Sequence, residues 1–185
     1  MNHRYLQKFQ IKDVVFLAIM SAVALATCAV MPLGISLQPL IFGISQLVTA
    51  LQIGVFFAIG LYKVRKPGSL LIMGLIQLMM SPPMFLSSVL NGVLIELIVL
   101  LLFRGYEKDA AVFVAAMLHT PLSLPFNYLY NRLVKGTDSP LAAVADRAPL
   151  AAVGMTLAVV AVSALGALIG IKIARELKKS GVLKK

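Results

Sequence analysis

The chain has 185 residues, of which 60% are hydrophobic and only 13% are charged, with 17 Lys and Arg against 7 Asp and Glu. An ordinary soluble chain is about half apolar and about a quarter charged, so this composition nearly excludes a soluble monomer. Six bilayer spans of roughly 20 residues each would leave about 65 positions for loops and ends, which predicts a single all-α membrane domain over residues 1–185.

Long apolar runs define the predicted spans. No charged residue lies between Asp13 and Lys63, a length that fits two helices separated by a break at Pro32, Gly34 and Pro39. The third span is too short to cross a hydrocarbon core of about 30 Å, so we expect it to be buried, tilted or partly irregular rather than lipid-facing. Pro121 and Pro125 interrupt the fifth. The six expected spans are 12–31, 40–62, 68–81, 84–103, 110–130 and 149–172.

The placement of the basic residues predicts the orientation. An even number of spans puts both termini on one side, and cytoplasmic loops carry the excess of Lys and Arg. Fourteen of the 17 basic residues fall in the two ends and the loops near residues 63–66 and 104–109; only Arg132, Lys135 and Arg147 fall on the opposite side. We therefore predict that both termini are cytoplasmic, and the positive charge needs no nucleic-acid partner.

Motifs for several classes of chemistry are missing. The sequence has no phosphate-binding loop, no paired cysteines, no H-E-x-x-H and no G-x-S-x-G. We therefore expect no enzyme activity, no cofactor and no metal, and any ATP-driven step must come from another chain. Only Glu96 and His119 are ionisable groups well inside the spans, and for both we favour a structural role.

Small side chains follow one face of the first predicted span. Ala18, Ala22 and Ala26 recur every four residues, and such stripes promote close helix packing in lipid. Docking of an external partner helix and packing inside the bundle are equally good interpretations here. For the similar stripe in the last span, which includes Gly166 and Gly170, internal packing is favoured.

Polar side chains in the later spans and the outer loops predict a binding site. Amides and phenols are costly against lipid, so Asn91, Asn127 and Tyr128 should turn inward, and the predicted topology puts them near one depth in the outer half. The outer loops would form a lid suited to a polar organic ligand with apolar parts. The candidate substrate-binding residues are Gln38, Met84, Asn91, Asn127, Tyr128, Asn131, Arg132 and Arg147.

With these features the chain resembles the S component, the substrate-binding membrane subunit, of an energy-coupling factor (ECF) vitamin transporter. The resemblance rests on the size, the six spans with cytoplasmic ends, the motif Ala18-Ile19-Met20-Ser21-Ala22, and the run Gly166-Ala167-Leu168-Ile169-Gly170 leading into the basic segment 172–179 and Ser180-Gly181-Val182. It implies a transmembrane coupling subunit that docks on Ala18, Ala22 and Ala26, two ATPase subunits, and a vitamin-like substrate in the cell membrane. Cobalamin or a fragment of it is the first candidate substrate, and hydroxymethylpyrimidine is the second.

A different class of function remains as the alternative. A non-transport membrane assembly or anchoring protein would use its small-residue faces only to hold partners together. An intramembrane enzyme using Glu96 and His119 is a weaker third interpretation, since no nucleophile or metal set accompanies them. Retention of a small molecule through purification would separate the first two.

Overall fold

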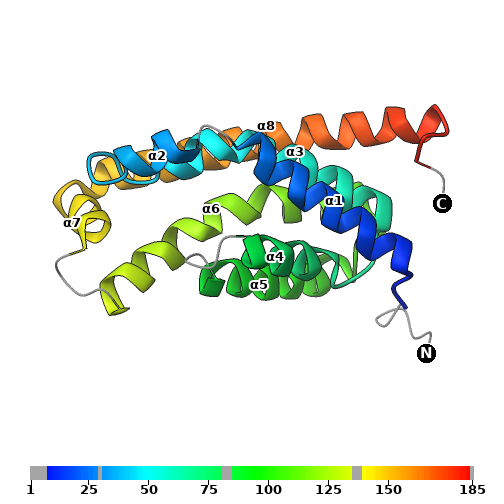
Figure 1. The fold of residues 1–185 in the computed structure, drawn as a ribbon, viewed down its shortest axis with the longest axis horizontal. Helices are drawn as coiled ribbons and strands as arrows, with labels where there is room; N and C mark the ends of the chain where they lie inside the picture. Colours follow the sequence, from blue (N-terminus) through cyan, green and yellow to red (C-terminus); the bar gives the residue numbers. More distant parts are fainter. Residues whose placement is uncertain (1–7, 29–30, 81–84, 135–138, 184–185) are drawn as a thin grey trace.

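The computed structural model describes residues 8–28, 31–80, 85–134 and 139–183, and these four ranges fold into an elongated bundle of α-helices without a β-strand (Figure 1). The all-α class is therefore confirmed for the described residues. In chain order the helices are α1 (Ile11–Thr27), α2 (Met31–Leu37), α3 (Ile44–Val64), α4 (Ser69–Met80), α5 (Phe85–Phe103), α6 (Asp109–Val134), α7 (Pro140–Arg147) and α8 (Pro149–Lys179).

Local sequence explains where several helices begin. In α1 the Asp13 carboxylate accepts a hydrogen bond from the Gln10 N–H at 3.0 Å. This contact gives a hydrogen-bond partner to a backbone N–H at the start of the helix. Both α7 and α8 begin with a proline, Pro140 and Pro149. Proline suits the first helical position because the missing N–H would have no partner inside the helix there.

Each predicted span contains a helix, but several boundaries differ. The first helix ends at Thr27 instead of 31, and the short helix α2 occupies the predicted break. The next begins at Ile44 instead of 40. At the far end, α6 continues to Val134 and α8 to Lys179, and α7 forms within the connection that was expected to be a loop. Polar and proline-rich stretches thus hold more helix than their composition indicated.

Helix length separates the elements that reach across a bilayer from the shorter ones. Among the described residues, α3, α6 and α8 are long and apolar enough to cross, and α5 adds the apolar stretch Val89–Phe103. Helix α1 has 17 residues and α4 has 12, so at about 1.5 Å per residue both are shorter than a core of about 30 Å. Six crossings therefore stay a prediction. The third span is buried on one face, with Leu70 and Met73 inaccessible, while Leu75 is exposed.

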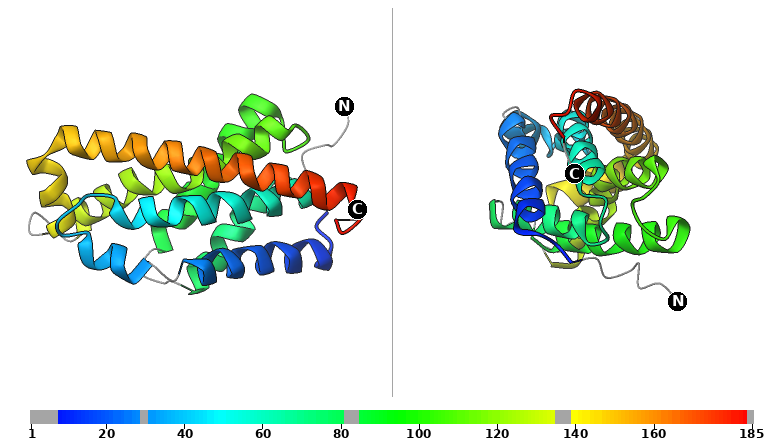
Figure 2. Two further views of the ribbon diagram at one scale, coloured as in Figure 1. Left: turned by 90° about the horizontal axis from the view of Figure 1, so that it is seen from above. Right: turned by 90° about the vertical axis from the view of Figure 1, so that its right-hand side faces the viewer.

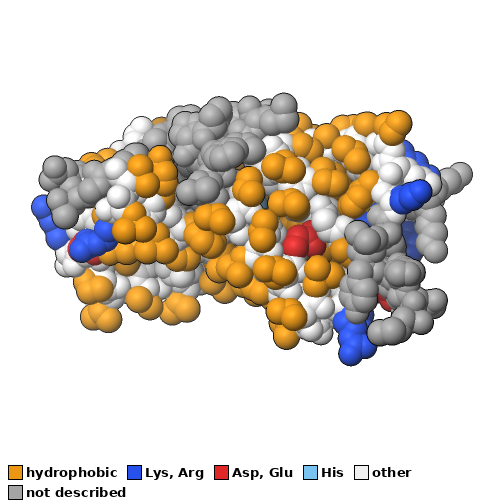
Figure 3. Space-filling model, turned by 90° about the horizontal axis from the view of Figure 1, so that it is seen from below, with side chains coloured by type: hydrophobic (Ala, Val, Ile, Leu, Met, Phe, Trp, Pro, Cys, Tyr) orange, Lys and Arg blue, Asp and Glu red, His pale blue; other side chains and the backbone are white. Residues whose placement is uncertain are grey.

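The loops rich in basic residues meet at one end of the bundle. The start of α1, the α3–α4 turn, the α5–α6 loop and the end of α8 lie together there, whereas α2 and α7 lie at the opposite end (Figures 1 and 2). Ion pairs join these segments: Lys66 Nζ lies 2.6 Å from Asp13 Oδ2, and Asp109 binds both Arg65 and Arg175. We call these the basic end and the α2–α7 end. Between them, hydrophobic side chains cover most of the face in Figure 3.

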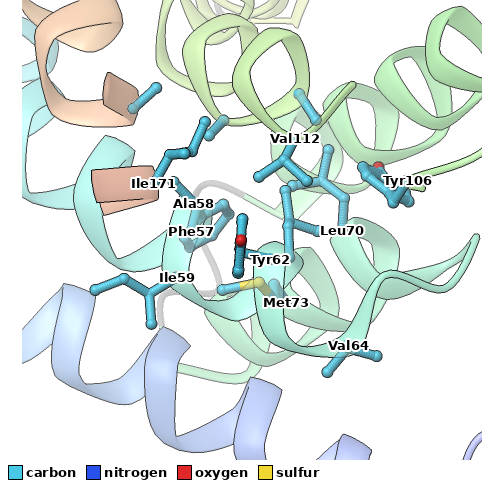
Figure 4. Close-up of a cluster of buried hydrophobic side chains, with 14 of the residues drawn as sticks. Phe57, Ala58, Ile59, Tyr62, Val64, Leu70, Met73, Tyr106, Val112 and Ile171 are labelled. Carbon is cyan, nitrogen blue, oxygen red and sulfur yellow. The ribbon is translucent and has the colours of Figure 1, made fainter. Parts of the chain in front are cut away.

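The main hydrophobic core joins α1, α3, α4, α5, α6 and α8. Phe57 from α3, Met73 from α4 and Val112 from α6 are fully buried, and their side chains gather around the same point (Figure 4). Tyr106 from the α5–α6 loop closes one side of this cluster. This core lies between the basic end and the middle of the bundle. A second, smaller cluster of buried apolar side chains, Ala50, Leu124 and Val159, lies toward the α2–α7 end, with Phe42 and Leu47 packed against it.

Glycines allow α3 and α8 to pack at backbone contact. A Cβ added at Gly166 would lie 2.5 Å from the Leu51 carbonyl oxygen, and one at Gly170 would overlap the Val55 carbonyl oxygen. From the other side, a Cβ at Gly54 would also meet the α8 backbone. The internal packing favoured for the stripe in the last span is therefore confirmed.

Helix α6 continues through both of its prolines, and α8 supplies a missing hydrogen bond. Pro121 has no N–H to donate to the Met117 carbonyl four residues earlier. The Ser163 hydroxyl of α8 donates to that carbonyl oxygen at 2.8 Å. A neighbouring helix has thus satisfied a backbone group that proline left free, which is how prolines are tolerated in membrane helices.

Replacing Ser163 with Ala should lower the free energy of unfolding by about 1 kcal/mol, because a buried carbonyl loses its donor. Denaturant unfolding in detergent micelles measures the change. Adding Pro121→Ala restores a backbone N–H for Met117, so the same serine substitution should cost less in that background. An equal cost in both backgrounds would contradict the assigned role of the hydroxyl.

Candidate functional site

A polar cluster ties the end of α6 to α7. Tyr128 and Arg132 lie four residues apart and therefore share one face of α6. The Tyr128 hydroxyl donates to Asp146 Oδ1 of α7 at 2.7 Å, and Arg132 donates to the other carboxylate oxygen. Both members of the ion pair are about half exposed, 46% and 42%. One carboxylate thus organises a phenol and a guanidinium at the surface of the α2–α7 end.

The same junction contains a second pair of contacts. The Ser139 hydroxyl, just before α7, donates to Asn131 Oδ1 at 3.0 Å, and Asn131 Nδ2 donates to the Asn127 carbonyl oxygen at 2.8 Å. Ser139 is buried, while the Asn127 side chain is half-buried. We call Asn127, Tyr128, Asn131, Arg132, Ser139 and Asp146 the α6–α7 cluster.

Another set of polar side chains lies where α2 leads into α3. Gln38 donates through Nε2 to the Ser45 hydroxyl, which in turn donates to Gln46 Oε1 at 2.8 Å. Ser45 and Gln46 are buried. A Cβ added at Gly43 would touch Leu124 of α6, so this turn packs against α6 about one helical turn before Asn127. Both polar sets therefore belong to the α2–α7 end.

A third polar group lies deeper, between α4, α5 and α6. The Asn91 amide faces the α6 backbone, where its Nδ2 can donate to the Leu122 carbonyl oxygen at 3.1 Å and its Oδ1 can accept from the Ser123 N–H at 3.2 Å. His119 Nε2 lies 3.1 Å from Gln77 Oε1. His119 Nδ1 and Thr120 Oγ1 are buried without a hydrogen-bond partner in the described part of the chain. Asn127 follows Leu122 and Ser123 by four to five residues, so Asn91 lies about 6–8 Å deeper than Asn127 along α6, whereas the sequence placed them near one depth.

The predicted site residues thus fall into separate groups. Asn127, Tyr128, Asn131 and Arg132 come together, Gln38 and Asn91 lie in the other two groups, and Met84 lies outside the described residues. Arg147 is exposed next to Asp146. Sequence reasoning had included Asp146 only as one of several charges in the long connection, and it had not selected Ser139, Ser45, Gln46 or Gln77. The visible signal for Gln77 was a lone amide in the apolar run 70–80.

The Glu96 side chain of α5 forms a hydrogen bond with the backbone of α4. Its Oε1 accepts a hydrogen bond at 2.9 Å from the N–H of Leu70, in the first turn of α4. The first N–H groups of a helix have no partner inside it, and a carboxylate is favoured at that positive end. Glu96 therefore caps α4 from α5, which is the kind of role that the sequence favoured.

The small-residue face of α1 lies at the border between core and surface. Leu17, Ser21 and Ala24 are buried against the bundle, Ala18 and Ala22 are half-buried, and the third member of the stripe, Ala26, is exposed. Farther round the helix, Ile19 is 50% exposed. An apolar face with small side chains thus stays open on the outside of α1, although α1 also packs on α3 and α4.

The described residues offer hydrogen-bonding groups for a ligand. In the four described ranges no group of three or more His, Cys, Asp and Glu is placed to hold a metal ion. Among the described residues, the polar groups of the α2–α7 end are amides, hydroxyls, the guanidinium groups of Arg132 and Arg147, and the carboxylate of Asp146. Such a set can orient a polar molecule through several hydrogen bonds.

Comparison with known proteins gives one family and one fold. A family model described as a hypothetical bacterial integral membrane protein (Trep_Strep) matches residues 11–179. A solved structure described as the crystal structure of an S-component of ECF transporter aligns with a TM-score of 0.65 and 20% sequence identity, over 95% of this chain and 89% of that chain. At this identity the likeness establishes the fold alone. No curated protein matches the sequence.

Proposed function

Since the chain belongs to the Trep_Strep family of hypothetical bacterial integral membrane proteins, we propose that it is the substrate-binding subunit, or S component, of an ECF-type importer in the cell membrane. The observation that carries this proposal is the fold, which follows an S-component over nearly the whole chain. The chain would bind a small molecule from outside and carry out no reaction of its own.

The proposed substrate site is the α2–α7 end. Side chains of the α6–α7 cluster and of Gln38 would contact the ligand, with Arg147 at the mouth; Met84 stays a candidate from the sequence alone. Asn91 and His119 would form the floor, where unpaired buried polar atoms would gain partners from a ligand that reaches them. These groups suit a water-soluble vitamin or precursor. Cobalamin or a fragment of it stays the first candidate and hydroxymethylpyrimidine the second.

The proposed partners follow from the same assignment. A transmembrane coupling subunit would dock a helix on the open face of α1 at Ala18, Ala22 and Ala26, since small side chains permit close approach. Two ATPase subunits would bind the coupling subunit and supply the energy. Conformational work done by that complex would then release the substrate to the inside.

Purification of the full chain followed by mass spectrometry of small molecules tests the proposal directly. We expect one vitamin-like compound to copurify near one equivalent, and the same compound should be taken up by cells that also express an ECF coupling module. If no compound is retained and uptake stays at background with every vitamin tested, the chain is an anchoring or assembly protein instead.

The orientation can be checked independently by thiol labelling. In a Cys28→Ser background we expect Lys108→Cys, at the basic end, to resist an impermeant reagent in whole cells, because basic loops stay cytoplasmic. Ala148→Cys, at the α2–α7 end, should react. Both positions are exposed, so accessibility does not bias the comparison. The reverse labelling pattern would overturn the topology and put the proposed site on the wrong side.

A further inference from the structure

A cavity opens at the basic end, away from the proposed substrate site. Its volume is about 570 Å³, and it lies between the start of α1, the end of α3 and the segment that follows α8. Five basic side chains and one carboxylate line it. Topology explains why basic residues collect at this end, but it does not explain why they surround a hollow.

Only part of this positive charge is neutralised. The carboxylate, Asp13, is paired with Lys66 at 2.6 Å, and Arg65 is paired with Asp109 outside the cavity. For the other three lining amines, Lys12, Lys63 and Lys178, the described residues provide no ion pair and no hydrogen bond. Three ammonium groups from three different elements therefore line the cavity without a partner among the residues that the structure describes.

The remaining lining is partly apolar. Phe16 of α1, Val64 of α3 and Leu183 of the C-terminal segment also contribute to the cavity wall. On the outside of α1, Val14 and Val15 are exposed next to it. A soluble anion would gain little from such surroundings, whereas an amphiphile could bind its charged head to the amines and keep its chains along α1.

The position along the bundle matches the depth of lipid headgroups. Figure 3 shows hydrophobic side chains over the middle of one face and Lys and Arg side chains toward its two ends. The cavity is lined by residues from the start of α1, the end of α3 and the segment after α8, at the basic end. Basic pockets at the ends of membrane helices bind phosphate-bearing headgroups, and phosphate oxygens accept several hydrogen bonds from lysines at once. We infer that this cavity is a binding site for the phosphate headgroup of an anionic phospholipid in the adjacent leaflet.

The bound lipid would bridge three different helices. Lys12 is on α1, Lys63 is on α3 and Lys178 is near the end of α8, so one phosphate would hold three helix ends together. This inference depends on the bundle lying in a membrane and not on the identity of any transported substrate. The inference can therefore fail while the proposed function holds, and the proposed function can fail while the inference holds.

Native mass spectrometry of the delipidated full chain tests the inference, with phosphatidylglycerol and phosphatidylcholine of identical acyl chains as probes. We expect phosphatidylglycerol to bind one site preferentially. Combining Lys12→Gln, Lys63→Gln and Lys178→Gln should weaken its binding at least about tenfold. The matched control combines Arg104→Gln, Lys108→Gln and Lys172→Gln, which removes the same charge from the same end outside the cavity. It should change the affinity less than about twofold if the cavity is the site.

Three results would overturn the inference. An equal loss in both triple variants would mean diffuse attraction to a positive surface, and equal binding of phosphatidylcholine would mean no recognition of the anion. Displacement by glycerol phosphate at the concentration at which the lipid binds would assign the cavity to a soluble phosphate. Lys12→Gln and Lys178→Gln are exposed single changes that preserve folding, and each should show a smaller loss in the same direction.

Discussion

Replacing Ala22 or Ala26 with Trp is expected to abolish assembly with the coupling subunit and to reduce uptake to background. An indole would fill the space in which a partner helix must approach the α1 backbone, and membrane helix association depends on that close packing. Ala26 is exposed and Ala22 is half-buried, so the added bulk meets the partner before it meets the core. Copurification with tagged coupling subunit and uptake of labelled substrate measure the two effects.

The isolated subunit separates docking from binding. Equilibrium binding of substrate to either variant should stay within about twofold of the unmodified chain, because α1 contributes none of the proposed site residues. The matched control is Ala161→Trp, which places the same bulk on an exposed face of α8. It should leave assembly intact. If Ala161→Trp blocks assembly equally, or if both α1 variants lose substrate binding, the α1 face is not the docking surface.

The two small-residue stripes show what sequence spacing can predict. Both have the four-residue period of a smooth helix face, and both were identified from sequence. Only the structure shows that Gly166 and Gly170 contact the α3 backbone, while the stripe of α1 ends at an exposed Ala26. Spacing describes one face of a helix but carries no information on which surface lies opposite. The sequence therefore could not decide whether the α1 stripe packs inside the bundle or docks an external partner helix.

The long connection between α6 and α8 was harder to predict for a local reason. Residues 139–148 contain two charges and follow a polar stretch, which is typical of a loop, yet Pro140 begins a helix that buries Ala142 and Ala145. In α6 the prolines predicted an interruption that the structure does not show. The hydroxyl that replaces the missing bond comes from Ser163, which is 42 residues after Pro121 in the sequence. Contacts between residues so far apart in the sequence leave no signal in the local periodicity of hydrophobic and polar residues.

For the candidate site, the sequence indicated which polar residues to consider but not how they are arranged in space. The four predicted side chains of α6, Asn127, Tyr128, Asn131 and Arg132, lie close together near the end of that helix, and their contact with a substrate stays a prediction. Asp146, which joins Tyr128 to Arg132, was one charge among several in the loop. Its role depends on α7 folding back onto α6. The greater depth of Asn91 depends on how α5 packs against α6, which a single-helix projection does not contain.

The largest loss of substrate affinity is expected from Tyr128→Phe and Asn127→Ala. Each removes a hydrogen-bonding group on the part of α6 that faces the α2–α7 end. If the ligand bonds to these groups, each change leaves a polar partner unpaired and should cost on the order of 1–3 kcal/mol, about tenfold or more in Kd. Equilibrium binding to the isolated subunit measures it, with the copurified compound as ligand.

Tyr130→Phe provides the matched control for the phenol. Tyr130 follows Tyr128 by two residues, which turns it by about 200° to the other side of α6, so loss of its hydroxyl should not change the affinity. Asp146→Asn addresses a different question, since it keeps an acceptor for Tyr128 but removes the ion pair with Arg132. If the tyrosine acts only by holding α7 in place, Tyr128→Phe and Asp146→Asn should lower affinity alike. If the phenol contacts the ligand, Tyr128→Phe should cost more. Unchanged affinity for Tyr128→Phe and Asn127→Ala, in protein that still assembles with its partners, would place the substrate away from the α6–α7 cluster.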